Sequence, residues 1–108
     1  MKGSNVGELE ELILLATANL HPNAYGNAIL DFLKDNAERT LALSTIHVTL
    51  QRLDKKGYVT SKFGESTPER GGRRKRYFEV TAAGYQAMTS VQEVRQRIWK
   101  MIPKRVLQ

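Results

Sequence analysis

Apolar side chains in the first third of the chain recur at steps of three and four residues, which is the spacing of a helix that buries one face. The first stripe comprises Leu9, Leu12, Ile13, Ala16 and Leu20. It predicts a helix that ends near His21, because Pro22 disfavours helical geometry in the residue before it. The second stripe comprises Tyr25, Ala28, Ile29, Phe32 and Leu33. It predicts a helix over residues 24–36.

A third helix is predicted to begin at Leu43 or Ser44 and to end at Gly57, because Ser44 is a suitable N-cap and glycine often follows a helix. Its buried edge consists of Ile46, Leu50 and Leu53. The other faces hold hydroxyl, amide, imidazole, methyl-bearing and cationic side chains, with Asp54 as the one carboxylate near the end. These side chains belong to Ser44, Thr45, His47, Val48, Thr49, Gln51, Arg52 and Lys55. A surface of this kind is suited to an anionic partner.

Two strand-like runs follow this helix, over residues 58–63 and 76–81. They predict a hairpin with a long glycine-containing loop between the strands. Cationic side chains are concentrated in this loop, at Arg70, Arg73, Arg74 and Lys75. The hairpin loop is therefore the second predicted contact for an anion, unless it is a basic loop without a partner.

The last segment is predicted to be a helix from Thr81 to about Ile102, where Pro103 stops it. Its apolar positions follow steps of four, three, four and three residues. They are Ala87, Val91, Val94, Ile98 and Met101. Because a helix of about 20 residues spans about 30 Å, its far end is expected to reach beyond its own domain and to form a dimer interface.

The charge is unevenly distributed along the chain. The length of 108 residues suits one small domain, and the net charge of +6 indicates a basic surface. Residues 1–38 have a net charge of −4, residues 39–76 of +7 and residues 77–108 of +3. The middle third therefore predicts a side of the protein that faces a polyanion, since ordinary solvated surfaces mix both signs.

Several functional classes are excluded by what the sequence lacks. No run approaches the roughly 18 apolar residues of a membrane helix, so no membrane partner is expected. The absence of cysteine is compatible with the reducing cytoplasm, and the two histidines lack partners at metal-ligand spacing, so neither metal nor cofactor is expected. No catalytic constellation is visible, and Glu8, Glu10 and Glu11 resemble ordinary first-turn charges, so the chain is not expected to be an enzyme.

The order of the predicted elements is that of a winged helix-turn-helix, in a mainly α (α+β) chain with a long C-terminal dimerisation helix. Residues 7–81 are predicted to form the DNA-binding domain and residues 82–102 the dimerisation helix, within one compact unit. The third helix is expected to enter the major groove of double-stranded DNA, and the hairpin is the wing. The alternative is a winged-helix module that docks proteins, because a fold does not fix a function.

Six short segments resemble the PadR-like family of bacterial transcriptional regulators. They are residues 7–16 (GELEELILLA), 23–29 (NAYGNAI), 50–57 (LQRLDKKG), 68–73 (PERGGR), 75–78 (KRYF) and 81–84 (TAAG). The resemblance covers residues 7–90 and implies a homodimer on a palindromic operator, with repression relieved by a small molecule or a stress signal. The single C-terminal helix resembles the small-subfamily type.

Further roles are predicted for single residues, and those of Tyr25, His47 and Trp99 are implied by the resemblance. Tyr25 either reaches a DNA phosphate or packs at the start of the second helix. His47 stands where the family usually has tyrosine, which implies a DNA contact, and the alternative is an ordinary surface residue. The protonation of a histidine varies near neutral pH. Val48 either touches a thymine methyl group or packs, and Arg76 either joins the wing cations or pins the strand. Trp99 either stacks a small hydrophobic or aromatic effector in a pore at the dimer centre or fills the dimer core.

Overall fold

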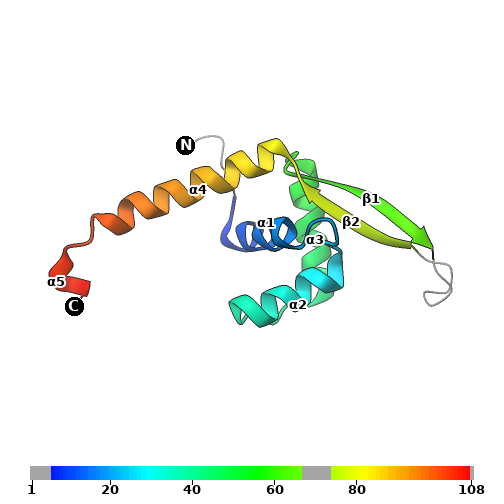
Figure 1. Ribbon diagram of the computed structural model, residues 1–108, viewed down its shortest axis with the longest axis horizontal. Helices are drawn as coiled ribbons and strands as arrows, with labels where there is room; N and C mark the ends of the chain where they lie inside the picture. Colours follow the sequence, from blue (N-terminus) through cyan, green and yellow to red (C-terminus); the bar gives the residue numbers. More distant parts are fainter. Residues whose placement is uncertain (1–5, 67–73, 108) are drawn as a thin grey trace.

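The computed structural model describes residues 6–66 and 74–107. Its elements, in chain order, are α1 (Glu8–Leu20), α2 (Gly26–Ala37), α3 (Leu43–Lys55), β1 (Val59–Ser66), β2 (Arg74–Val80), α4 (Ala82–Lys100) and α5 (Lys104–Leu107). The first three helices pack together, the β1–β2 hairpin projects from one end of this body, and α4 leaves it in the opposite direction (Figure 1). This arrangement confirms the mainly α winged helix-turn-helix with a long C-terminal helix.

The core lies where α1, α2 and α3 meet the base of the hairpin. Helix α1 contributes three fully buried apolar side chains, Ile13, Leu14 and Ala16. The other members of the core cluster are Ala24, Ile29, Leu33, Ile46, Leu50, Leu53, Val59, Phe78, Val80 and Met88. The predicted inner edge of α3 is therefore confirmed, and its opposite face is left free for another role.

The hairpin is longer than the sequence pattern predicts. The strands pair antiparallel from Val59↔Val80 to Phe63↔Arg76, and the register then shifts before Ser66↔Arg74. Arg74 and Lys75 thus belong to β2 and not to the loop, whereas Arg70 and Arg73 lie outside the described residues. The Phe78 N–H donates a hydrogen bond of 2.8 Å to the Ala24 carbonyl, which ties the hairpin to the segment before α2.

The start of α3 corrects the expected N-cap. Leu43 is the first helical residue and Ala42 is the N-cap, without a side-chain hydrogen bond. Ser44 lies in the first turn and is exposed. The end of the helix is as predicted, because Gly57 follows the C-cap with φ of 80°, a conformation that glycine adopts readily.

Two of the acidic residues of α1 are buried and paired, which corrects their interpretation as ordinary first-turn charges. Glu10 forms an ion pair of 2.9 Å with Lys56, and Glu11 forms one of 3.0 Å with Arg95. Burial raises the pKa of Glu10, but the hydrogen bond from the Gly7 N–H and the Lys56 ammonium outweigh it, so the pKa lies below 4.5. Through these pairs α1 holds both the end of α3 and the middle of α4.

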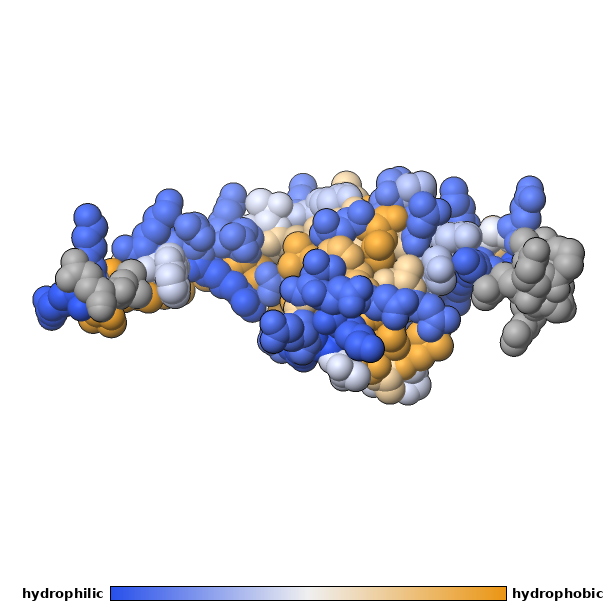
Figure 2. All heavy atoms as spheres, turned by 60° about the horizontal axis from the view of Figure 1, so that its bottom comes forward, coloured by the Kyte–Doolittle hydropathy of each residue, from blue (hydrophilic) through white to orange (hydrophobic). Residues whose placement is uncertain are grey.

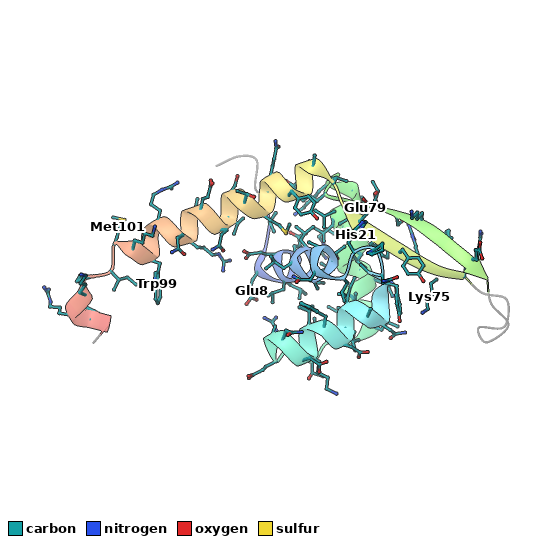
Figure 3. All side chains as sticks on the ribbon, viewed as in Figure 1. Glu8, His21, Lys75, Glu79, Trp99 and Met101 are labelled. Carbon is teal, nitrogen blue, oxygen red and sulfur yellow. The ribbon has the colours of Figure 1, made fainter. Side chains whose placement is uncertain are left out.

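Helix α4 divides into a part packed on its own domain and a part that leaves it. Ala87 and Met88 are 4% and 9% exposed. Ala87 therefore packs on its own domain, contrary to the prediction that it lies in the dimer interface. Ile98 and Met101 are 59% and 73% exposed. Figure 3 shows Trp99 and Met101 at the far end of α4. The predicted seam is therefore covered near the domain and uncovered beyond it, with Val94 half-buried between the two parts.

The helix also ends earlier than predicted. Its last residue is Lys100, with Met101 as the C-cap, and the short α5 follows Pro103. Proline is compatible with the start of a helix because its missing N–H has no partner there in any case. Pro103 therefore precedes a further helical turn instead of closing the structured chain. No helix among residues 6–66 and 74–107 has the length and apolar content needed to span a membrane.

Candidate nucleic-acid interface

The face of α3 opposite the core is exposed and carries most of the side chains predicted to meet DNA. The exposed members are Ser44, His47, Val48, Gln51, Arg52 and Lys55, with Thr45 half-buried. Val48 is 50% exposed although it is apolar, and its methyl groups are available to a partner. This face combines donors, acceptors, one apolar contact and two cations on a helix of the size that the major groove admits.

Thr49 differs from the expectation that it would contact DNA. It is only 2% exposed, and its hydroxyl donates a hydrogen bond of 2.8 Å to the Thr45 carbonyl. This local bond satisfies the hydroxyl, so a threonine can be buried on the inner side of a helix. Thr49 is therefore part of the packing and not of the outer face.

His47 lies against the first turn of α2. A Cβ placed on Gly26 would come within 2.9 Å of two ring atoms of His47 and 3.2 Å of a Leu43 methyl carbon. Only a residue without a side chain leaves room for the imidazole here. The close approach joins the first turns of α2 and α3 and places the ring at the edge of the exposed face.

Tyr25 connects the start of α2 to the wing. Its ring meets the ring of Tyr77 edge to face at a centroid distance of 5.8 Å, and the Lys75 ammonium lies 4.0 Å from its centroid. Figure 3 shows Lys75 on the side of β2 that faces α2. Tyr25 thus packs against the hairpin, while its predicted phosphate contact stays a prediction. The cluster fixes a wing cation next to the start of α2.

The opposite side of the wing carries a second group of cations around Phe63. The guanidinium carbons of Arg74 and Arg76 lie 5.1 and 5.6 Å from the centre of the Phe63 ring. The Arg76 Nε also donates a hydrogen bond of 2.8 Å to the Ser61 hydroxyl on the neighbouring strand, so Arg76 does pin the strands. The sequence pattern does not indicate a role for Phe63, since only the register of the hairpin brings it opposite Arg76.

In Figure 2, hydrophilic side chains cover much of the coloured surface on either side of the helical body, and apolar side chains reach the surface mainly over that body. Among the described residues, the ion pairs involve Arg39, Lys56 and Arg95. Within the described chain, Lys55 of α3 and the cations of β2 form none of these ion pairs, whereas Arg52 lies close enough to Glu10 to lower the pKa of that carboxyl. The cations without an ion pair are available to an anionic partner.

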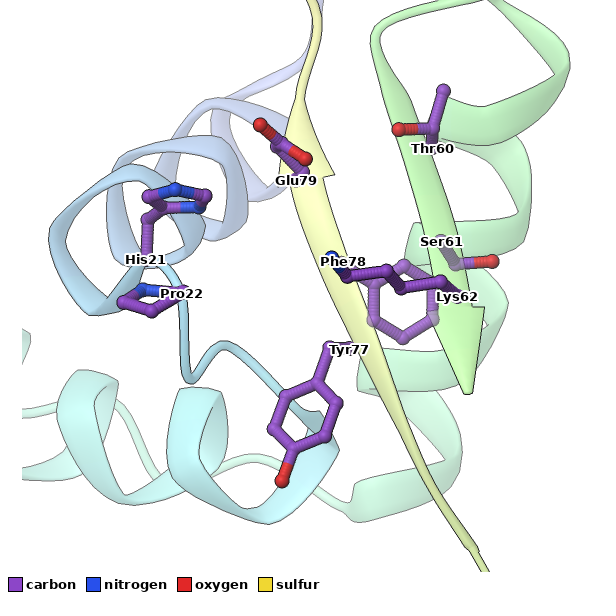
Figure 4. Close-up of a pocket in the computed structure, with 8 residues that line it drawn as sticks. All are labelled: His21, Pro22, Thr60, Ser61, Lys62, Tyr77, Phe78 and Glu79. Atoms are coloured by element: carbon purple, nitrogen blue, oxygen red, sulfur yellow. The ribbon is translucent and has the colours of Figure 1, made fainter. Parts of the chain in front are cut away.

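Two hollows lie away from this face. One of about 70 Å³ separates the α1–α2 connection from the hairpin, with His21 and Glu79 on opposite walls (Figure 4). It is small beside the roughly 300 to 1,000 Å³ of ordinary ligand pockets. The other, of about 300 Å³, lies between α1 and α4. It is lined by Glu11, Leu15, Met88, Thr89, Gln92 and Glu93, so Trp99 is not part of it.

Residues 14–90 match the model of the transcriptional regulator PadR-like family. No curated protein sequence matches the chain. A PadR-like transcription factor structure from Bacteroides fragilis has 22% sequence identity, a TM-score of 0.74, and coverage of 87% of this chain and 85% of that chain. A PadR family regulator from Clostridium difficile has 22% identity and a TM-score of 0.70 over 94% of this chain and 100% of that chain.

The structure of Bacillus subtilis PadR in complex with operator DNA is also similar. It has 19% identity and a TM-score of 0.66, and the match covers 79% of this chain and 46% of that chain. At these identities the three solved structures share the fold with this chain.

Proposed function

The chain belongs to the PadR-like family of transcriptional regulators, and on that basis we propose that it is a sequence-specific DNA-binding repressor. The observation that carries this proposal is the outer face of α3, which is exposed, rich in donors and poor in carboxylates. On this account Thr45, His47 and Val48 contact base edges in the major groove, and Arg52 and Lys55 contact phosphates. The protein then acts where bacterial DNA lies, in the cytoplasm.

The wing supplies affinity in this proposal. Arg74 and Lys75 lie on opposite faces of β2, since neighbouring residues of a strand alternate. Each phosphate that such a cation neutralises releases counterions, which favours binding and makes it dependent on salt. Arg70 and Arg73 are also predicted to contact phosphates, but they lie outside the described residues.

We further propose a homodimer that binds a palindromic operator. The support is the exposed apolar end of the chain, where Ile98, Trp99, Met101 and Val106 are each more than half exposed. A two-fold axis through paired α4 helices would present two copies of α3 to two half-sites, and a palindrome has that same symmetry. Removing this apolar surface from water provides the driving force.

A small hydrophobic or aromatic effector would bind at the dimer and release the DNA. Trp99 is 57% exposed and offers a flat surface for stacking. This proposal depends on the dimer, because Trp99 lies outside the hollow between α1 and α4 of its own chain.

Selection of bound fragments from genomic DNA by the full chain tests the function. The proposal predicts a recovered motif with two-fold symmetry and binding that weakens steeply as salt is raised. A winged-helix module that docks proteins would recover no motif. Heparin binding at two salt concentrations separates this outcome from general attraction to polyanions.

A further inference from the structure

We propose that Phe63 is a positioning residue for DNA binding, whose exposed ring holds the guanidinium groups of Arg74 and Arg76 ready for the phosphate backbone. The inference rests on the proposed DNA-binding function and adds a role for a residue that carries no charge. It also makes Arg76 a DNA contact as well as a strand pin.

The geometry around the ring is that of a platform with two cations. The guanidinium carbons lie 5.1 Å (Arg74) and 5.6 Å (Arg76) from its centre, within the distance at which a cation is attracted to an aromatic face. Arg76 has two further contacts, since it lies 5.4 Å from the centre of the Phe78 ring and donates a hydrogen bond to Ser61. Its side chain is thus held in one place by groups on both strands.

The register explains why these three residues meet. Phe63 is paired with Arg76 across the hairpin, and directly paired residues project from the same face of a sheet. Arg74 lies two residues along the same strand and shares that face. Lys75 points to the other face, where it meets Tyr25. The wing therefore has ordered cations on both sides.

The exposure of Phe63 indicates that it does not serve the core. The residue is 57% exposed and is absent from both the buried core cluster and the side chains packed against it. Within the described chain neither Arg74 nor Arg76 forms an ion pair, so both guanidinium groups keep donors for an outside acceptor.

Two arginine side chains that are already ordered lose less conformational entropy when they bind DNA. A free arginine loses rotamer freedom when it is fixed on a phosphate, and a side chain that is already held loses less. The ring itself neutralises no phosphate. Loss of the ring should therefore weaken binding while the number of released counterions stays the same, and loss of an arginine should change both.

The test compares Phe63→Leu, Phe63→Tyr, Arg76→Gln and the Phe63→Leu/Arg76→Gln double variant on the DNA fragment that the wild-type chain selects. Phe63→Leu is expected to weaken binding by about three- to tenfold with an unchanged salt slope. Phe63→Tyr keeps the ring and should bind within about twofold of wild type. Arg76→Gln should lower the log-salt slope by about 0.9. The double variant should lose less than the product of the single losses, because both changes act on one contact.

Three results would overturn the inference: a Phe63→Leu variant that binds like wild type, equal losses in the leucine and tyrosine variants, or independent effects of Phe63 and Arg76. Circular dichroism of each variant establishes that the fold is kept, and the tyrosine and glutamine variants carry the test if the leucine variant fails to fold. A wild-type chain that selects no DNA would sink the proposed function together with the inference. Normal wild-type binding with an unaffected Phe63→Leu variant would sink the inference alone.

Discussion

The imidazole of His47 lies over the backbone of Gly26, so close that a Cβ at Gly26 would come within 2.9 Å of the Cε1 and Nε2 atoms of the ring. The contact joins the first residue of α2 to the N-terminal part of α3. It fixes the direction of a side chain on the face that we propose to read DNA. The position of the His47 imidazole therefore depends on residue 26 being glycine.

Replacing Gly26 with alanine tests this dependence. The new methyl group should displace the imidazole, which is the mobile end of a side chain, while alanine itself is well tolerated in a helix. We expect operator binding to weaken by about 1 to 2 kcal/mol, roughly the value of one base contact, with little change in melting temperature. In a His47→Ala background the same substitution should cost much less. Equal losses in both backgrounds would show that Gly26 acts independently of His47.

The sequence predicted the elements whose evidence is local. The three- and four-residue steps of apolar residues identified the inner edge of α3, and Gly57 marked its end. The prediction from the sequence was wrong where a contact in the folded chain outweighed the local pattern. Thr49 appeared to be an outer residue, yet its bond to the Thr45 carbonyl allows it to be buried. The long C-terminal helix does end before Pro103, at Lys100, but the short α5 that follows it was not predicted.

Contacts between distant parts of the chain could not be predicted in this way. Glu10 and Lys56 are separated by 46 residues, and only the packing of α1 against α3 brings them together. Nothing near Phe63 in the sequence points to Arg76, which becomes its neighbour through the hairpin register. The residues predicted to contact DNA were therefore those of α3 and of the hairpin loop, together with Tyr25, and the positioning residues between elements were missed.

The Glu10–Lys56 pair should make stability sensitive to acid. Because the pKa of Glu10 is lowered in the folded chain, its contribution to stability is complete at pH values above 4.5 and is lost as the pH falls through the lowered pKa. Glu10→Gln should destabilise the chain by about 1 to 3 kcal/mol at pH 7, since it leaves the partly buried Lys56 without its carboxylate. The difference from wild type should shrink in chemical denaturation at acidic pH.

Glu8→Gln is the matched control, because Glu8 pairs with Arg39 at the surface, where its side chain is 64% exposed. Exposed pairs of this kind contribute little. A Glu8→Gln variant as destabilised as Glu10→Gln, or a Glu10→Gln effect that does not vary with pH, would contradict the role assigned to the buried pair.

The wing cations should contribute affinity without sequence preference. Replacing Arg74 and Lys75 together with alanine should weaken binding to different DNA sequences by similar factors. It should also lower the log-salt slope by about 0.9 for each phosphate that the variant no longer neutralises. The slope is measured from binding titrations at several salt concentrations. An unchanged slope, or a change in the preferred sequence, would count against this role.

The far end of α4 should be required for dimerisation. Ile98→Asp places a charge at a position that is 59% exposed in the single chain, so the fold should survive while the dimer is lost. Sedimentation equilibrium should show a monomer, and tight operator binding should disappear. Val94→Asp should have the same effect, whereas Gln96→Asp adds the same charge off the seam and should leave the dimer intact. A stable Ile98→Asp dimer would rule out this interface.

The central claim is that the outer face of α3 reads a DNA sequence. The measurement that tests it most directly is selection from a random DNA library, carried out in parallel with the wild-type chain and with Thr45→Ala, His47→Ala and Val48→Ala variants. The account predicts a two-fold symmetric motif for the wild type and a changed base preference at one symmetric pair of positions for each variant. An absent wild-type motif, or the same motif recovered by all four proteins, would contradict it.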